Sequence, residues 1–213
     1  MEFIAHRGYW KSANERNSLV AFERAFSMGF GVETDVRDLD GVAVISHDPP
    51  SKGAIPFEEF VALYKKIGSH TCLSLNIKSD GINALIKSDL VRHDVTNYFC
   101  FDMSVPDSLR YFSSDLRVYT RRSEYEAPSE LDAKAQGVWL DAFVEPFVPV
   151  NQILRCQQER NNYCLVSPEL HNKPYAEAWD LWRQVIDSDS SIVPAICTDE
   201  PEAAARYFLG RSV

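Results

Sequence analysis

Short apolar, β-branched segments alternate with longer amphipathic segments along the whole chain. The patterns predict eight strands of one direction, starting at residues 3, 31, 72, 98, 116, 137, 163 and 195. Strands that alternate with helices form parallel sheets, because each helix returns the chain to the edge where the last strand began. The chain is therefore predicted to have an α/β fold, and the count of strands favours a (β/α)8 TIM barrel over residues 1–213 as one domain.

The intervening segments predict helices. One begins at Leu19 with Asn17 or Ser18 as its cap, one follows Pro201, and the others cover residues 57–67, 81–91, 105–113, 124–135, 146–161 and 174–187. Asp40-Gly41 predicts a tight turn, with Val42–His47 returning as an antiparallel strand. The rival architecture is an open doubly wound sheet. Its nucleotide-binding form is disfavoured, since no glycine-rich phosphate loop follows a strand.

Composition narrows the classes of partner. The formal net charge of −9 argues against sequence-independent binding to nucleic acid or to an anionic membrane. No apolar run is long enough to span a bilayer. The five cysteines are scattered and odd in number, which predicts small core residues in a reducing compartment. These features predict a cytoplasmic protein, and they are compatible with a small anionic substrate; the oligomeric state is not readable from them.

Polar residues stand at the carboxyl ends of the first two predicted strands, where catalytic groups of a barrel lie. Strand 1 ends in His6 and Arg7, an acid or base beside a cation that can grip phosphate or carboxylate. In strand 2, the period of two places Glu33, Asp35 and Arg37 on one face. Two buried carboxylates repel each other unless a cation lies between them, so Glu33 and Asp35 predict a Mg²⁺ or Ca²⁺ site.

Three more residues extend this set. His47 ends the return strand, one hairpin away from Asp35. Asn76 and Lys78 share a face of the third predicted strand, where the amide oxygen can bind a metal and the lysine adds a cation at the barrel mouth. Two histidines, two carboxylates, an amide oxygen and two basic side chains suit phosphoryl chemistry, with one imidazole as base and the other as acid.

The motifs, in this order and spacing, resemble the glycerophosphodiester phosphodiesterase family. The matching segments are His6-Arg7-Gly8, Asn17-Ser18-Leu19, Glu33-Thr34-Asp35-Val36, His47-Asp48-Pro49, Asn76-Ile77-Lys78 and Thr198-Asp199-Glu200-Pro201. The resemblance implies a TIM barrel and metal-dependent hydrolysis of a small phosphodiester, as in lipid metabolism. It implies that Glu33, Asp35 and Asn76 hold the metal, that His6 and His47 form the acid/base pair, and that Arg7 and Lys78 bind the phosphate.

The chain departs from the family pattern at three places. Asn76 stands where the family has a glutamate, which removes one negative charge and predicts weaker metal binding. The glutamate of the family's Pro-Glu-Asn-Thr segment falls on Arg16, with Glu15 next to it as a substitute. The segment between His47 and the third strand is short, so the fold is a compact barrel without the family's usual insertion.

Several alternatives stay open at this point. Trp139 and Glu169, at later strand ends, are candidates for contacts with a substrate head group. The attacking group is water or a hydroxyl of the substrate, and either histidine is the base. A barrel with a degraded metal site, acting as a binding or regulatory protein, is the main alternative function, and an isomerase or lyase acting on a sugar phosphate is a weaker one.

Overall fold

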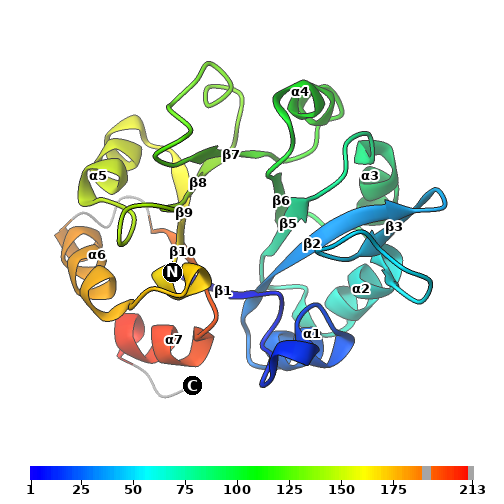
Figure 1. The fold of residues 1–213 in the computed structure, drawn as a ribbon, viewed down its shortest axis with the longest axis horizontal. Helices are drawn as coiled ribbons and strands as arrows, with labels where there is room; N and C mark the ends of the chain where they lie inside the picture. The colour runs from blue at the N-terminus through cyan, green and yellow to red at the C-terminus, as the bar shows by residue number, and fades with distance from the viewer. Residues whose placement is uncertain (189–192, 211–213) are drawn as a thin grey trace. The chain divides into compact units, whose positions relative to one another are not determined.

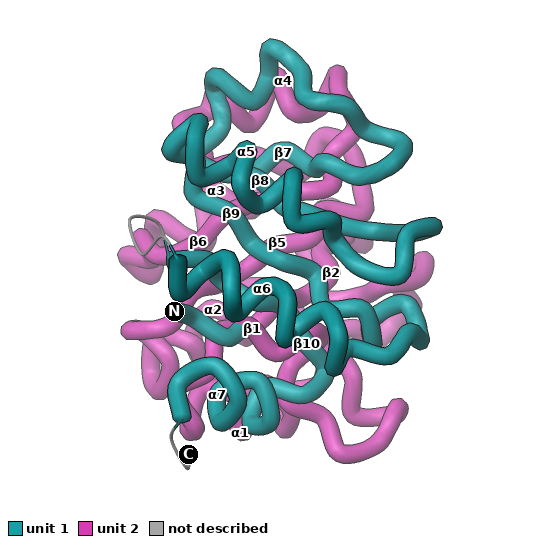
Figure 2. The backbone as a smooth tube through the Cα atoms, turned by 90° about the vertical axis from the view of Figure 1, so that its left-hand side faces the viewer, with its two compact units in different colours: residues 1–3, 119–213 teal, residues 4–118 magenta. Residues whose placement is uncertain are grey.

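The computed structural model describes residues 1–188 and 193–210. The chain forms two compact units, one of residues 4–118 and one of residues 1–3 together with 119–213 (Figure 2). Each unit is an α/β structure with its own parallel strands, and each is described here by itself.

The unit of residues 4–118 is built on four parallel strands. They pair in the order β1 (Glu2–His6, whose last three residues belong to this unit), β2 (Gly31–Leu39), β5 (Leu73–Ile77) and β6 (Tyr98–Phe101). The return strand β3 (Val42–Ile45) pairs antiparallel with β2, as predicted, and leads into the short β4 (Ile55–Pro56). The turn between β2 and β3 has φ values of 51° at Asp40 and 82° at Gly41, which suit a two-residue hairpin.

Helices cover one face of these strands, as Figure 1 shows for α2 (Phe57–Leu63) and α3 (Asn83–Arg92) beside β2 and β5. The sheet's other helical neighbours are α1 (Leu19–Ser27) and α4 (Val105–Ser113), and a short 3₁₀ turn spans Ala13–Glu15. The helix predicted over 57–67 is α2 continued by a π-helical turn, Tyr64–Gly68. Phenylalanines from α1 and α2 form the core between them, with the rings of Phe22 and Phe60 4.7 Å apart.

The other unit repeats the pattern with four more parallel strands. They pair in the order β7 (Tyr119–Arg122), β8 (Gly137–Leu140), β9 (Asn162–Val166) and β10 (Ala195–Thr198). Its helices are α5 (Val150–Glu159), α6 (Ala176–Ser188) and α7 (Pro201–Leu209), with a 3₁₀ turn over Pro168–His171. The eight strands predicted from the sequence therefore all form.

The helix predicted over residues 124–135 is wrong. This segment is a series of turns, starting with backbone hydrogen bonds in both directions between Ser123 and Glu126. The Glu126 carboxylate accepts hydrogen bonds from the Arg121 guanidinium and the Ser123 hydroxyl, which fold the chain back on itself. Pro128 lacks the N–H that a helix needs at this point. Prolines also delay α5, which begins at Val150 directly after Pro149 rather than at residue 146.

Asp102 and Asp199, whose place shortly before Pro106 and Pro201 predicts helix caps, do not cap the helices that follow them. Ser104 caps α4, and its hydroxyl accepts a hydrogen bond from the backbone N–H of Asp107. The cap position of α7 is Glu200, which makes no side-chain cap bond. All five cysteines are buried, as predicted for core residues. Within residues 1–188 and 193–210, no helix is both long enough and apolar enough to cross a membrane.

Candidate functional site

Strand register brings the predicted site residues of residues 4–118 together. His6 of β1 lies opposite Glu33 of β2, and Asp35 of β2 lies opposite Asn76 of β5. Because the strands are parallel, these pairs lie at the same carboxyl edge of the sheet, two residues apart along β2. Register alone therefore accounts for the meeting of residues that are up to 70 positions apart in the sequence.

Glu33 and Asp35 are almost inaccessible to solvent, with 1% and 0% of their surface exposed. Basic groups surround them. The His6 Nε2 atom lies 3.9 Å from the Glu33 Oε2 atom, and the Arg7 backbone N–H donates to the same oxygen at 3.2 Å. The Arg7 Nε atom lies 3.1 Å from Asp35 Oδ2. Buried carboxylates are tolerated only with such compensation, so this edge is built around negative charge.

Burial and the neighbouring Asp35 carboxylate raise the pKa of Glu33 to about 7, against the opposing effect of His6, Arg7 and Lys78. The local cations therefore do not fully offset the removal of this carboxylate from water. A perturbed carboxyl among charged groups at a strand end is typical of a functional site.

Asn17 is a site residue that was predicted only as part of a family motif and as a possible helix cap. Its Nδ2 atom donates to Asp35 Oδ2 at 2.9 Å, and its Oδ1 atom accepts from the Thr34 hydroxyl at 2.8 Å. Its backbone lies in the left-handed region, with φ of 56°. The helix cap of α1 is Ser18 alone, which frees Asn17 to orient the carboxylate. Its place in the Asn-Ser-Leu motif was the available signal.

Lys78 connects the carboxylates to a residue that sequence reasoning did not place in the site. Its Nζ atom donates to Asp102 Oδ2 at 2.8 Å and lies 3.9 Å from Asp35 Oδ1. Asp102 follows β6 directly and has a left-handed backbone with φ of 72°. The signal that could have found it is the rule that identified His6, a polar residue at the end of a parallel strand.

Three buried oxygens at this edge lack a hydrogen-bond partner among the described residues: the Ser74 hydroxyl, opposite Glu33, and one carboxylate and one amide oxygen. The last two are the stronger metal ligands. They are Asp35 Oδ1 and Asn76 Oδ1, which come from residues paired directly across β2 and β5. Unsatisfied buried acceptors are rare in folded proteins, and hard oxygen atoms are the ligands that Mg²⁺ and Ca²⁺ prefer. The donor set of Glu33, Asp35 and Asn76 thus fits a divalent cation. This set contains only two carboxylates and an amide. Groups of three or more His, Cys, Asp or Glu residues that could hold a metal ion do not occur in the described ranges.

His47 lies on the exposed loop after β3, with 46% of its side chain accessible. Its Nδ1 atom lies 2.9 Å from Asp48 Oδ1, and its backbone carbonyl accepts a hydrogen bond from Arg37 Nε at 2.9 Å. Arg37 also donates to the carbonyl of Lys78 at 3.0 Å, so one guanidinium joins the chain at His47 to the chain at Lys78. The structure gives the His47 ring a contact with Asp48, and gives no contact of that ring with Glu33 or Asp35 within the described part of the chain.

Glu15 serves the loop before α1. Its carboxylate accepts hydrogen bonds from the Lys11 backbone N–H and from Arg24, both at 2.8 Å. The guanidinium of Arg16, next to it, lies 4.3 Å from the Trp10 ring centre. The contacts described for Glu15 are thus those of a loop brace, and they do not extend to the carboxylates of β2.

Trp139 and Glu169 belong to the other unit. Trp139 is buried on β8 with 4% of its surface exposed. Glu169 accepts hydrogen bonds from the hydroxyls of Ser167 and Thr198, both at 2.5 Å, and from the Asp199 N–H at 3.1 Å. Burial raises the pKa of Glu169 against these hydrogen bonds. Their expected contact with a head group stays a prediction.

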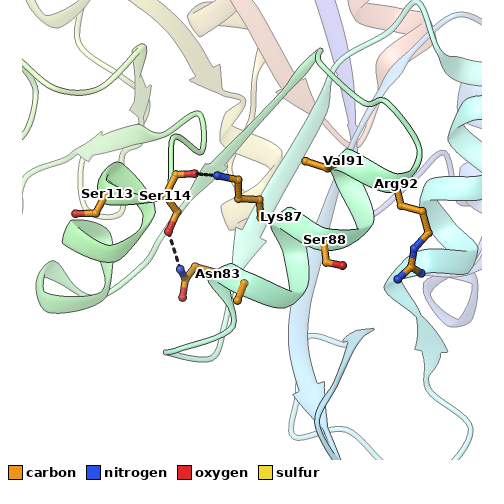
Figure 3. Close-up of a pocket in the computed structure, with 8 residues that line it drawn as sticks. Asn83, Lys87, Ser88, Val91, Arg92, Ser113 and Ser114 are labelled. Atoms are coloured by element: carbon orange, nitrogen blue, oxygen red, sulfur yellow. Dashed lines mark hydrogen bonds between the residues drawn. The ribbon is translucent and has the colours of Figure 1, made fainter.

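A groove of about 700 Å³ lies between α3 and α4 (Figure 3), and its lining includes none of the charged residues at the strand ends. Lys87 Nζ bonds the Ser114 carbonyl and Asn83 Nδ2 bonds the Ser114 hydroxyl across it. Its described lining offers no paired acid and base, so it is not a candidate for catalysis.

Solved structures with the same fold cover essentially the whole chain. A glycerophosphodiester phosphodiesterase from Parabacteroides distasonis has a TM-score of 0.73 at 20% identity, covering 100% of this chain and 98% of its own. A phosphodiesterase from Oleispira antarctica, solved in complex with the product sn-glycerol-3-phosphate, has a TM-score of 0.71 at 17% identity, covering 97% and 96%. A Ca²⁺-dependent phosphatidylinositol-specific phospholipase C from Streptomyces antibioticus has a TM-score of 0.60 at 11% identity, covering 97% and 95%.

No protein-family model and no curated protein matches the sequence. The likeness to known proteins is therefore one of structure, and it agrees with the α/β, TIM-barrel class predicted from the strand count. The chain has, over its full length, the fold of solved glycerophosphodiester phosphodiesterases.

Proposed function

We propose that this chain is a phosphoric diester hydrolase of the glycerophosphodiester phosphodiesterase family. Its substrate would be a small phosphodiester and its whole length a single catalytic domain. The fold supports this proposal, and so do the motifs that carry the family resemblance. The observation that carries it is the pair of buried carboxylates, Glu33 and Asp35, set among His6, Arg7 and Lys78 at one edge of parallel strands.

A divalent cation, Mg²⁺ or Ca²⁺, would be held by Glu33, Asp35 and Asn76. The support is the chemistry of this donor set, with one unpartnered buried oxygen each on Asp35 and Asn76. When bound, such an ion neutralises phosphate charge and acts as a Lewis acid. The Ca²⁺ dependence printed for the Streptomyces phospholipase belongs to that enzyme and does not select the ion for this one.

The chain's own residues would bind the phosphate and move two protons. The Arg7 guanidinium and the Lys78 ammonium would contact the phosphate oxygens, where charge builds up in the transition state. One of His6 and His47 would take the proton from the attacking oxygen, while the other gives a proton to the oxygen that leaves. The new P–O bond forms as the P–O bond to the alcohol breaks. Attack by water gives a monoester directly, and attack by a substrate hydroxyl gives a cyclic ester first.

A panel of phosphodiesters tests the activity. Glycerophosphocholine, glycerophosphoethanolamine, lysophospholipids and sugar-linked diesters are incubated with the full chain, with and without a chelator, and the products are followed by phosphorus NMR. Conversion of a diester to a monoester or cyclic ester, lost with chelator and restored by Mg²⁺ or Ca²⁺, is the expected outcome. Isomerisation of a sugar phosphate, or its cleavage by a lyase reaction, with no diester consumed, would contradict the proposed hydrolase activity.

The histidines supply the second test. His6→Ala and His47→Ala should each lower the turnover of an established diester by roughly 10²- to 10⁴-fold, because each removes a proton transfer. His70→Ala is the matched control, since His70 is an exposed surface histidine. Circular dichroism and thermal unfolding of all three variants establish that the fold survives. Near wild-type turnover in both site variants would refute the assignment.

One observation favours a different function, a barrel that binds a ligand without catalysis. Arg7 and Lys78 already partly neutralise Asp35, and the third oxygen donor is the neutral amide of Asn76. Calorimetric titration with Mg²⁺, Ca²⁺ and Mn²⁺ separates the two functions. Saturable binding that disappears in Glu33→Gln supports the enzyme, whereas no binding of any cation favours the non-catalytic protein. A cytoplasmic location stays a prediction, which rests on the five buried cysteines.

A further inference from the structure

The Lys78 ammonium lies between two carboxylates that hold it unequally. It is hydrogen-bonded to Asp102 Oδ2 at 2.8 Å, whereas Asp35 Oδ1 is 3.9 Å away, beyond hydrogen-bond range. Among the described residues, no other carboxylate oxygen lies within 4.0 Å of this ammonium, and Glu33 is affected by its charge only at longer range. Asp102 therefore determines where the charge of Lys78 sits, and Asp35 Oδ1 is left without a hydrogen bond.

The backbone at Asp102 has a conformation that is uncommon for residues other than glycine. Its φ of 72° lies in the left-handed region, which strains every residue except glycine and is best tolerated among the others by Asp and Asn. Strain of this kind concentrates at functional sites, where the surrounding structure enforces it. The conformation occurs where β6 ends, and the preceding residue, Phe101, is paired with Asn76 of β5. The turn at Asp102 thus directs its carboxylate toward Lys78, two residues beyond Asn76.

We infer that Asp102 is a positioning residue that holds the Lys78 ammonium off Asp35, so that Asp35 Oδ1 stays available to a cation and the ammonium stays available to a phosphate. This inference rests on the proposed function for the roles of Asp35 and Lys78. Without the Asp102 charge, the nearest remaining carboxylate is Asp35, and an ion pair there would occupy both groups at once. Loss of Asp102 should therefore weaken binding of cation and of phosphate together.

Asp102→Asn is the test, because asparagine has the same shape and tolerates the same backbone. The probes are Mn²⁺, followed by electron paramagnetic resonance, and sn-glycerol 3-phosphate, followed by calorimetry on the full chain. Each affinity should fall about three- to tenfold, the size expected for a partly exposed charge-assisted hydrogen bond. Asp102→Gly, which also permits φ of 72°, is a second variant in case the first folds poorly.

Asp94→Asn is the matched control. Asp94 is also an aspartate with positive φ, 51°, and it also pairs with a lysine, with 3.9 Å between Lys65 Nζ and Asp94 Oδ2. The same charge is removed from the same unit, so a general effect of charge or strain would appear in both variants. Binding of both probes should be unchanged in Asp94→Asn.

A double-mutant cycle with Lys78→Met shows whether Asp102 acts through Lys78. If it does, Asp102→Asn has no further effect on Mn²⁺ or phosphate binding once Lys78 is replaced. Equal effects in the two backgrounds, unchanged affinities in Asp102→Asn, or a wild-type protein that binds neither probe would each overturn the inference. A wild type that hydrolyses no diester, with the Asp102 effect still present, would instead remove the proposed function and leave the inference standing.

Discussion

At the scale of single residues, Glu33 is a carboxyl group almost completely removed from water. It is buried to 1% exposure beside Asp35, and this raises its pKa to about 7 from an ordinary value of 4.5. The folded protein therefore keeps a proton on Glu33 in a range of pH where the unfolded chain has released it. This carboxylate contributes a destabilising charge above that range, which a bound cation would relieve.

The pH dependence of stability should reveal this charge. Well below pH 4.5, Glu33 is protonated in both the folded and the unfolded chain. Between pH 4.5 and about 7 the free energy of unfolding falls as pH rises, because only the folded chain still holds the proton. Glu33→Gln removes the titration. The variant should thus gain stability relative to wild type as pH rises from 4 to 8, by on the order of 3 kcal/mol in the absence of divalent cations.

Urea unfolding of both proteins in chelator, at intervals of half a pH unit, measures the difference. Subtracting the two curves cancels the contributions of groups too far from Glu33 to be affected by its charge. A difference that stays flat between pH 4 and 8, or that falls, would show that Glu33 ionises as freely as an exposed glutamate.

At the scale of elements, the junction between β1 and α1 depends on close backbone contact. Gly8 has φ of 82°, and a Cβ atom there would lie 2.9 Å from the Ala21 backbone carbon and 2.9 Å from the Phe22 ring. The following residue donates its N–H to the Ala21 carbonyl at 2.9 Å, which fixes the loop on the helix. A side chain at position 8 would push this loop, which carries Arg7, away from α1.

Gly41 offers a direct comparison, since it has the same φ of 82° but no atom within 4 Å of a Cβ. Gly41→Ala should cost about 1 kcal/mol of unfolding free energy through backbone strain alone. Gly8→Ala should cost that amount plus about 1–3 kcal/mol for overpacking. Chemical unfolding of the two variants gives the difference, and equal losses would mean that the β1–α1 junction yields without strain.

Local signals explain which elements could be predicted from the sequence. The helix over 105–113 begins and ends where expected because Ser104 caps it and Pro106 lies in its first turn. The segment over 124–135 has helix-forming composition, yet its glutamate at 126 is drawn into contacts with Arg121 and Ser123. Propensity is a weak prior, and here these local side-chain hydrogen bonds together with Pro128 outweigh it.

Some residues of the candidate site could likewise be predicted from local patterns, and others could not. Period two in β2 was enough to place Glu33 and Asp35 on a shared face, and both are buried near the point where the parallel pairing of β2 with β1 and β5 ends. Asn17 and Asp102 stand in a motif and at a strand end, but their partners lie 18 and 24 positions away, so these local signals did not show what the two side chains contact. Both have positive φ, a feature that packing enforces and that residue type alone suggests only weakly.

At the scale of the whole molecule, the net charge of −9 attracts any cation, so nonspecific screening has to be separated from binding at one site. Because the proposed cation ligands all lie within residues 4–118, a bound cation should stabilise mainly the strands that carry them. Mg²⁺ or Ca²⁺ at about 100 times its dissociation constant should add about 2.7 kcal/mol to the unfolding free energy at pH 8, since it binds only the folded chain. Sodium chloride at equal ionic strength reproduces the screening without the site.

Hydrogen exchange then locates the stabilisation. The added protection should be largest in β1, β2 and β5, which carry the predicted ligands and their neighbours, and Glu33→Gln should abolish it while leaving the effect of sodium chloride intact. Melting temperatures with and without chelator give the magnitude on the same samples. Equal protection by both salts, or protection by Mg²⁺ that survives in Glu33→Gln, would mean that the cation acts on the overall charge of the molecule and that the two carboxylates of β2 are not its ligands.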